Sequence, residues 1–285
     1  MRVFLNGRLM PAESAAIPLN DRGLLFGDGI YEVTRGADGE FIEIERHLKR
    51  LKRNLREMSI EVPESRLTEL VDASQTLLRE NAPQGDALIY WQITRGAAPR
   101  VHHFPPPGTL PTIFATAYPF TLPHAVRARG AAVITTADIR WSRCDIKTVN
   151  LLPNVFAKQR AVEAGADEAI FVRDGIVTEG ASSNVFAIID GEIRTYPASP
   201  YILGGISRDV TLELITDLGR TVSFEPFLLE AMYKAEELWM TSTTNDVMPI
   251  VRADGRQIGN GRPGRFTMEL YAAFAEHIGG VTAKR

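Results

Sequence analysis

The chain has 285 residues, of which 45% are hydrophobic and 24% are charged, and its formal net charge is −3. This composition is that of a globular protein with enough apolar material for a sizeable core, in one large domain or two unequal ones. The weak negative charge gives no electrostatic basis for binding nucleic acid or an anionic membrane. No apolar run reaches the roughly 18 residues needed to span a bilayer, and the turn at Asn6-Gly7 comes too early for a signal peptide. The single cysteine, Cys144, excludes an internal disulfide, so we expect a soluble, cytoplasmic protein.

Strands and helices alternate along the sequence. Strand-like runs bounded by turn residues predict strands over Val3–Leu5, Ala87–Thr94 and Thr112–Tyr118. Apolar residues spaced three and four apart predict helices over residues 44–58, 67–78, 154–164, 210–218 and 266–278. The last three helices are expected to end at Gly165, at Gly219 and before Gly279-Gly280.

Four Asp-Gly pairs mark expected tight turns. Asp-Gly supplies the positive φ angles that a two-residue hairpin needs, and each pair lies near β-branched or apolar residues. The pairs are Asp38-Gly39, Asp174-Gly175, Asp190-Gly191 and Asp254-Gly255. Antiparallel hairpins should therefore be common.

The segment Pro119-Phe-Thr-Leu-Pro123 is expected to separate two domains, because its prolines forbid a continuous helix or central strand. We therefore predict an α+β fold. Residues 1–118 would form a small N-terminal domain, residues 119–123 the linker, and residues 124–285 a larger domain.

Lys147 is a candidate for a lysine that reacts with a carbonyl carbon. Such an amine must be unprotonated near neutral pH, so it must be desolvated or lie beside another cation. The chain has only six lysines, and Lys147 lies in the apolar context Asp145-Ile-Lys-Thr-Val-Asn-Leu-Leu-Pro153. The alternative is a lysine whose stem covers apolar surface while its head reaches solvent. Lys158, in a predicted helix, remains a second candidate.

Two polar segments could bind an anion. Leu203-Gly-Gly-Ile-Ser-Arg208 precedes a predicted helix, so its glycines, the N-cap candidate Ser207 and the helix dipole would favour a phosphate. Thr241-Ser-Thr-Thr-Asn245 follows an apolar run and could donate hydroxyl groups to phosphate oxygens. A capped glycine turn and a local hydroxyl turn are the respective alternatives.

Glu179 lies in Thr178-Glu-Gly-Ala-Ser-Ser-Asn184, between short apolar runs. A carboxylate where a strand meets a loop could keep the pyridine nitrogen of a cofactor protonated, which would make the ring an electron sink. An ordinary acidic turn residue is the alternative.

Arg100-Val-His102 has strand spacing, so both side chains would point to one face if the segment is extended. The planar fork of arginine suits a carboxylate, and a neighbouring histidine adds a donor. The surrounding prolines suggest a rigid loop, where substrate contacts are common. Two solvated loop residues are the alternative, and His103 could equally be the useful histidine.

Together and in this order, the motifs resemble fold type IV pyridoxal 5'-phosphate (PLP) enzymes, the class IV aminotransferase family. Within that family they are most similar to the D-amino acid aminotransferases. The matching segments span residues 20–245 and comprise Phe26-Gly-Asp-Gly-Ile-Tyr-Glu-Val33, Arg50, Thr94-Arg-Gly96, Arg100-Val-His102, Cys144-Asp-Ile-Lys147, Thr178–Asn184, Gly205-Ile-Ser-Arg-Asp209 and Thr241-Ser-Thr-Thr244.

The resemblance implies a larger C-terminal domain that has a β-barrel-like core and binds PLP. Lys147 would form the Schiff base with the cofactor and move a proton between the substrate Cα and the cofactor C4′, and Glu179 would pair with the pyridine nitrogen. The groups that would hold the phosphate are Arg50, the backbone of Ile206, Ser207 and Thr243. Those that would bind the substrate α-carboxylate are Tyr31, Arg100 and His102. Only the family match identifies Arg50; helical periodicity does not.

The implied reaction is a ping-pong transamination of D-amino acids, for example D-alanine with 2-oxoglutarate, without a metal. The resemblance also implies a homodimer in which Arg100 and His102 could reach across the interface. Ser207 stands where threonine is usual, and Ala181 replaces a serine, which puts one hydrogen bond near the site in doubt. Cys144 is expected to be a small buried residue.

Other functions of the same fold remain open. They are a branched-chain L-amino acid transaminase, an (R)-amine transaminase and a lyase acting on aminodeoxychorismate. Branched-chain enzymes usually carry glycine at the place of Val33, so Val33 favours the D-amino acid enzymes. A PLP-binding protein without catalysis is the remaining alternative, and Lys147 with Glu179 argues against it.

Overall fold

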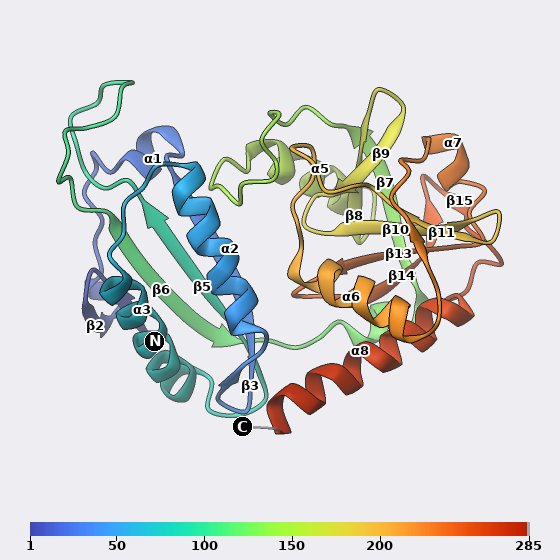
Figure 1. Cartoon of the computed structure of the whole chain (residues 1–285), viewed down its shortest axis with the longest axis horizontal. Helices are drawn as coiled ribbons and strands as arrows, with labels where there is room; N and C mark the ends of the chain where they lie inside the picture. Colours follow the sequence, from blue (N-terminus) through green and yellow to red (C-terminus); the bar gives the residue numbers. More distant parts are fainter. Residues whose placement is uncertain (284–285) are drawn as a thin grey trace. The chain divides into compact units, whose positions relative to one another are not determined.

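The computed structural model describes residues 1–283, which form two compact units (Figure 1). The first unit contains Met1–Thr121 and the short segment Ile146–Asn150, and the second contains Leu122–Asp145 and Leu151–Gly280. None of the helices within residues 1–283 is long and apolar enough to cross a membrane.

The first unit is built on a six-stranded antiparallel sheet with two long helices, and its core lies between them. The strand order is β2-β1-β6-β5-β3-β4. The strands are β1 (Arg2–Leu5), β2 (Arg8–Pro11), β3 (Gly29–Ala37), β4 (Glu40–Phe41), β5 (Asp86–Thr94) and β6 (Thr112–Pro119). The helices are η1 (Ala12–Ser14), α1 (Arg22–Phe26), α2 (Ile44–Glu57) and α3 (Glu64–Asn81). Leu51 and Leu70 from the long helices pack in one cluster with Trp91 of β5, all fully buried.

The second unit contains a closed β-barrel. Strand β10 pairs with both β13 and β9, which closes the ring β10-β13-β14-β7-β8-β9. Its strands are β7 (Ala131–Ala137), β8 (Glu168–Arg173), β9 (Ile176–Gly180), β10 (Asn184–Ile189), β13 (Glu237–Ser242) and β14 (Asp246–Ala253). The attached strands are β11 (Glu192–Thr195), β12 (Val222–Ser223) and β15 (Arg256–Gln257). The helices are α4 (His124–Arg129), α5 (Leu152–Glu163), α6 (Ile206–Asp217), α7 (Leu229–Met232) and α8 (Arg265–Ala283). The predicted α+β class and barrel-like core are confirmed.

The four Asp-Gly pairs that were expected to mark turns all form hairpins, whereas a fifth, Asp28-Gly29, leads into β3. The four pairs join β3 to β4, β8 to β9, β10 to β11 and β14 to β15, and each pair of strands is antiparallel. The aspartates have φ between 49° and 52°, which is the left-handed region that the turn requires. Three of these hairpins, β8–β9, β10–β11 and β14–β15, belong to the second unit.

Two expectations differ from the structure. The last helix does not stop before Gly279-Gly280 but continues to Ala283, because glycine inside a helix costs only about 1 kcal/mol relative to alanine. The segment Ile146–Asn150 groups with the first unit, although the predicted division assigns it to the second. Backbone hydrogen bonds explain this: Tyr31 N–H donates to the carbonyl of Lys147 at 2.9 Å, and Val149 N–H donates to that of Gly29 at 3.1 Å.

Candidate active site

Lys147 lies against the aromatic face of Tyr31 in the first unit. Its Nζ is 4.2 Å from the centre of the Tyr31 ring, and the residue is half-buried between the buried side chains of Ile146 and Thr148. The ring covers one side of the amine. Lys158 has a different environment, because its exposed Nζ donates to the carbonyl of Asp167 at 2.5 Å. Lys147 is therefore the better placed of the two candidate lysines.

A buried acid follows Tyr31 in the chain and holds Arg50. Glu32 accepts hydrogen bonds from Arg50 Nε at 2.9 Å and from Arg50 Nη2, and His47 Nδ1 lies 3.3 Å from it. Burial alone would raise the pKa of Glu32, but Arg50 and His47 more than offset it, so the pKa is held far below its usual range. Burial also lowers the pKa of His47. Glu32 is thus an ionised group that fixes the guanidinium of Arg50.

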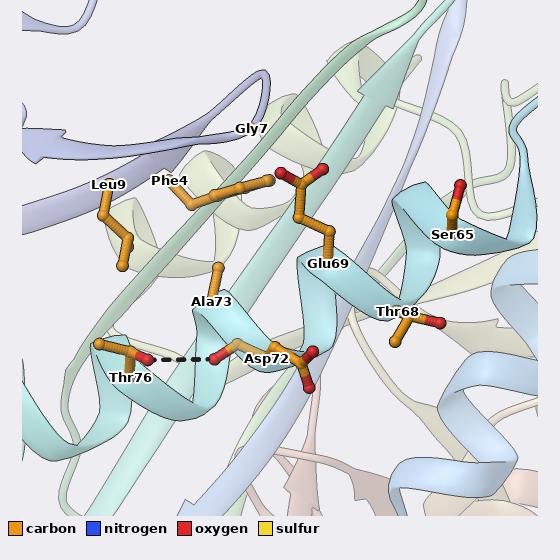
Figure 2. A pocket seen from close by; sticks show the side chains of 9 residues that line it. All are labelled: Phe4, Gly7, Leu9, Ser65, Thr68, Glu69, Asp72, Ala73 and Thr76. Atoms are coloured by element: carbon orange, nitrogen blue, oxygen red, sulfur yellow. Dashed lines mark hydrogen bonds between the residues drawn. The ribbon is translucent and has the colours of Figure 1, made fainter.

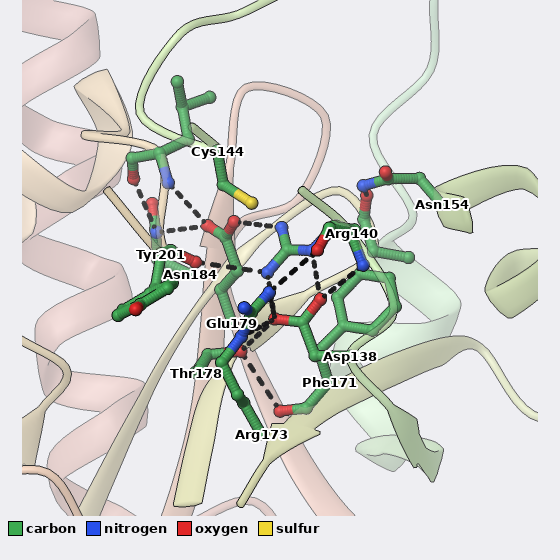
Figure 3. A network of polar contacts seen from close by, with 12 residues as sticks. Asp138, Arg140, Cys144, Asn154, Phe171, Arg173, Thr178, Glu179, Asn184 and Tyr201 are labelled. Atoms are coloured by element: carbon green, nitrogen blue, oxygen red, sulfur yellow. Dashed lines mark hydrogen bonds and ion pairs between the residues drawn. The ribbon is translucent and has the colours of Figure 1, made fainter. Parts of the chain in front are cut away.

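In the second unit, Glu179 is a buried carboxylate surrounded by donors (Figure 3). One carboxylate oxygen accepts from Arg140 Nη1. The other accepts from Leu203 N–H at 3.0 Å and from Asn184 Nδ2 at 3.1 Å. Burial raises the pKa of Glu179 to about 7, against the opposing effect of Arg140. The hydrogen bonds therefore fix the direction in which the carboxyl group of Glu179 points, and its pKa lies near neutral pH.

Arg140 and Asp138, which sequence reasoning did not identify, hold Glu179 in place. Arg140 donates through Nε and Nη2 to the two carboxylate oxygens of Asp138, each at 2.9 Å, and Arg173 pairs with Asp138 at 3.2 Å. Figure 3 shows Arg140 between the two carboxylates. The only signal in the sequence is the alternating Asp138-Ile-Arg140 after an apolar strand, which is too common to be diagnostic.

The start of α6 is a potential anion site. The N-cap is Gly205, and no side chain caps this helix, so the prediction that Ser207 is the N-cap is wrong; Ser207 is buried in the first turn. A Cβ on Gly205 would lie 2.2 Å from Asn184 Oδ1, so a larger residue would displace the Asn184 side chain from its hydrogen bonds to Glu179 and Leu203. N–H groups in the first turn of an uncapped helix, together with the helix dipole, favour a phosphate.

Asn184 connects this helix start to the acid and to the hydroxyl segment. In the sheet, Asn184 is the β-pairing partner of Glu179 on β9 and of Thr241 on β13. Thr241 Oγ1 is buried and makes no hydrogen bond among residues 1–283, which leaves a donor for a ligand. Ser242 Oγ lies 3.2 Å from Thr244 Oγ1, so Thr243 sits in a turn built from hydroxyl groups. Asn184 ends the motif that contains Glu179, but the sequence alone predicts no role for it.

Arg100 and His102 lie on the ring of Phe26 in the first unit. The Arg100 guanidinium carbon is 5.4 Å from the ring centre, and the His102 ring is 5.6 Å from it. Both side chains therefore share one neighbour, although the segment is not a strand. Tyr31 instead contacts Lys147 and stacks on Tyr90 at 5.7 Å, so the three predicted carboxylate-binding residues do not form one cluster within the described chain.

An open hollow of about 450 Å³ lies in the first unit between α3 and the β1–β2 hairpin (Figure 2). It contains none of the candidate residues. It is lined by Phe4, Gly7, Leu9, Ser65, Thr68, Glu69, Asp72, Ala73 and Thr76. Within residues 1–283 no group of histidine, cysteine and acidic residues is arranged to hold a metal ion. Cys144 is buried as expected, and burial raises the pKa of its thiol to about 11.

The raised pKa of Glu179 predicts how the stability of the cofactor-free protein depends on pH. The folded protein keeps a proton on Glu179 up to about pH 7, whereas the unfolded chain releases it near 4.5. The contribution of Glu179 to stability is therefore fully present below pH 4.5 and is lost as the pH rises through 7. Thermal unfolding at several pH values should show the wild type losing about 3 kcal/mol relative to Glu179→Gln over this range. A difference that does not vary with pH would contradict the shift.

The chain is similar over nearly its whole length to known proteins. It matches the family described as "Amino-transferase class IV" over residues 29–253. A D-alanine aminotransferase of Staphylococcus epidermidis is 42% identical over 277 residues, covering 97% of this chain and 98% of that protein. One from Bacillus licheniformis is 40% identical and covers 100% and 99%. Among solved structures, the branched-chain amino acid aminotransferase from Escherichia coli gives a TM-score of 0.86 at 26% identity, covering 97% of this chain and 94% of that one.

Proposed function

The chain belongs to the class IV aminotransferase family, and from that membership we propose that it transfers the amino group of D-amino acids to 2-oxo acids. D-Alanine and 2-oxoglutarate would give pyruvate and D-glutamate in a ping-pong reaction. The observation that carries this proposal is the 42% identity, over 97% of the chain, with a D-alanine aminotransferase. Val33 supports it too, since glycine is usual there in the branched-chain enzymes.

Members of this family depend on PLP, and the residues present fit that cofactor. Lys147 would bind it covalently through Nζ, and Glu179 would pair with the pyridine nitrogen. The phosphate would be held by Arg50, the backbone of Ile206, Ser207 and Thr243. The uncapped start of α6 and the unpartnered Thr241 Oγ1 support this choice. When bound, PLP supplies an electron sink for the bond that breaks at the substrate Cα.

Lys147 would act as the base and acid of the reaction. The amine of Lys147 would take the proton from the substrate Cα and deliver it to the cofactor C4′. The ring of Tyr31, 4.2 Å from Nζ, limits the space in which the amine moves. Glu179 would keep the proton on the pyridine nitrogen, and Arg140 with Asn184 and the amide of Leu203 would fix its direction.

Tyr31, Arg100 and His102 would bind the substrate α-carboxylate. Arginine provides a bidentate fork, and the tyrosine and histidine add donors. Because Arg100 and His102 contact Phe26 rather than Tyr31 within one chain, we propose a homodimer in which each copy supplies these two residues to the other. Apolar side chains on α5 are exposed by 54% to 62% at Leu152, Val155 and Phe156, which supports an interface. Dilution-dependent sedimentation tests the dimer. A cytoplasmic location also stays a prediction.

The main alternative is a branched-chain L-amino acid transaminase, because a solved structure with 26% identity has that activity in its name. Incubating the purified holoenzyme with D-alanine and, separately, with L-leucine distinguishes the two. We expect the absorbance of the lysine-bound cofactor to decay with D-alanine only. Decay with L-leucine alone would support the branched-chain enzyme. Repeated turnover of aminodeoxychorismate to pyruvate without an amino acceptor would support a lyase of the same fold.

Arg100→Ala tests the carboxylate-binding role. Loss of a bidentate, charge-assisted contact of about 1.5–3 kcal/mol should raise KM for D-alanine roughly 10- to 100-fold. The affinity for PLP should stay unchanged, since no phosphate contact is assigned to Arg100. Steady-state kinetics and cofactor titration measure both. A variant that loses PLP while keeping its KM would assign Arg100 to the cofactor instead.

A further inference from the structure

Four residues of the first unit hold the loop that carries Arg100 and His102, and none of them belongs to the cofactor site described above. They are Arg22, Phe26, Asp28 and Arg95. Resting on the proposed function, we propose that these four residues, here called the loop anchor, are positioning residues that fix Arg100 and His102 and so set the affinity for the substrate carboxylate.

The loop needs such an anchor because it has little structure of its own. Residues 99–104 lie between β5 and β6 without helix or strand, and all of them are exposed. Side chains that must be ordered on binding cost roughly 0.5–1.5 kcal/mol each. A loop held in its binding conformation before the substrate arrives avoids that cost.

Arg22 holds the middle of the loop by its backbone. This residue is only 3% exposed, and its Nη1 donates to the carbonyl of Val101 at 2.7 Å. Its Nη2 lies 3.5 Å from the carbonyl of His102. Both contacts are to carbonyl groups, so they fix the path of the backbone and leave the side chains of Arg100 and His102 available.

Asp28 orients two arginines at once. Its Oδ2 accepts from Arg22 Nε and from Arg95 Nε, each at 2.8 Å. Arg95 in turn donates to the carbonyls of Met58 and Ser59 at 2.6 and 2.7 Å, and its guanidinium carbon lies 3.6 Å from the centre of the Phe104 ring. One buried carboxylate thus ties the loop at residues 101–102 and again at residue 104.

Phe26 provides the surface on which the functional side chains rest. The guanidinium of Arg22 lies 4.7 Å from the ring centre, that of Arg100 lies 5.4 Å from it, and the His102 ring lies 5.6 Å from it. Stacking on one ring brings Arg100 and His102 to a common neighbour. The anchor therefore fixes both the backbone and the side chains of the loop.

Phe26→Leu and Asp28→Asn test the anchor. Phe26→Leu keeps an apolar side chain and leaves the ion pairs of Asp28 with Arg22 and Arg95 in place, so it should fold. Amide hydrogen exchange at Ala98 and Val101, whose N–H groups donate to the carbonyls of Asn20 and Pro99, should become about tenfold faster in both variants. In the holoenzyme, KM for D-alanine should rise about tenfold or more, with kcat and the PLP dissociation constant nearly unchanged.

Asp86→Asn is the matched control. Asp86 is also an acid paired with an arginine, Arg35, at 3.4 Å, but it lies at the opposite end of β5 from the loop. Asp86→Asn should leave amide hydrogen exchange in the loop and KM for D-alanine unchanged. Unaltered exchange in Phe26→Leu, or faster exchange with unaltered KM, would overturn the proposal. The exchange measurement needs no substrate. If the wild type does not react with D-alanine, the proposed function is refuted, but the exchange rates still test the loop anchor.

Discussion

Lys147→Ala is expected to abolish transamination, with a loss of about 10⁴-fold or more, and to remove the absorbance of the lysine-bound cofactor. Both effects have one cause, because Nζ of Lys147 would form the covalent link and also move the proton. The structure supports the choice of this lysine by placing it half-buried against Tyr31. Half-reaction spectra with D-alanine and steady-state rates measure the two effects.

Lys158→Ala is the control for that experiment. Lys158 is the other lysine that sequence reasoning left open, and its Nζ is occupied on the exposed side of α5 by Asp167 and Glu168. The variant should keep both activity and absorbance. If Lys158→Ala were inactive and Lys147→Ala active, the covalent role would pass to Lys158.

Glu179→Gln is expected to lower kcat by roughly 10²- to 10³-fold, because a neutral amide cannot stabilise the positive charge on the pyridine nitrogen of the cofactor. Glu179 accepts three hydrogen bonds, from Arg140, Asn184 and the amide of Leu203. A glutamine has only one acceptor oxygen, so its NH₂ group would face a donor. The cofactor would then lose both the charge beside its pyridine nitrogen and the fixed direction of that contact.

Glu168→Gln is the matched control for Glu179→Gln. Glu168 is an equally buried acid of the same barrel, on β8, where it accepts from Ser182 Oγ at 2.6 Å. Its replacement should lower the melting temperature without a comparable fall in kcat. If the two variants lose activity to the same extent, the effect of Glu179 is structural and the pairing with the pyridine nitrogen is wrong.

Local sequence patterns predicted those parts of the fold that depend on neighbours along the chain. The three- and four-residue spacing of apolar side chains predicted α2 and α3, and the Asp-Gly pairs predicted four hairpins. The nine-residue strand β3 was not predicted, although its segment was recognised as a motif. The reason is that it carries Glu32 and Arg35, both buried, and charged residues normally mark exposed positions.

The site depends instead on residues that are distant in sequence, which explains what could not be predicted. Arg140, in the segment that follows β7, contacts Glu179 of β9, and a side chain at position 205 would displace Asn184 of β10. The pairing of Arg50 with Glu32 likewise joins α2 to β3. The sequence shows the residues that can act in catalysis, but only the three-dimensional structure shows which residues they contact.

The barrel closes at Glu179 itself, and this has a consequence for folding. Strands β9 and β10 meet in the pairing of Asn184 with Glu179, which completes the ring of strands. A chain in which this seam is still open has an acid without its Asn184 donor and a helix α6 without its neighbour at Gly205. The geometry that would receive the cofactor is thus complete only when the ring of strands is closed, so a ligand bound there stabilises the closed barrel relative to open forms.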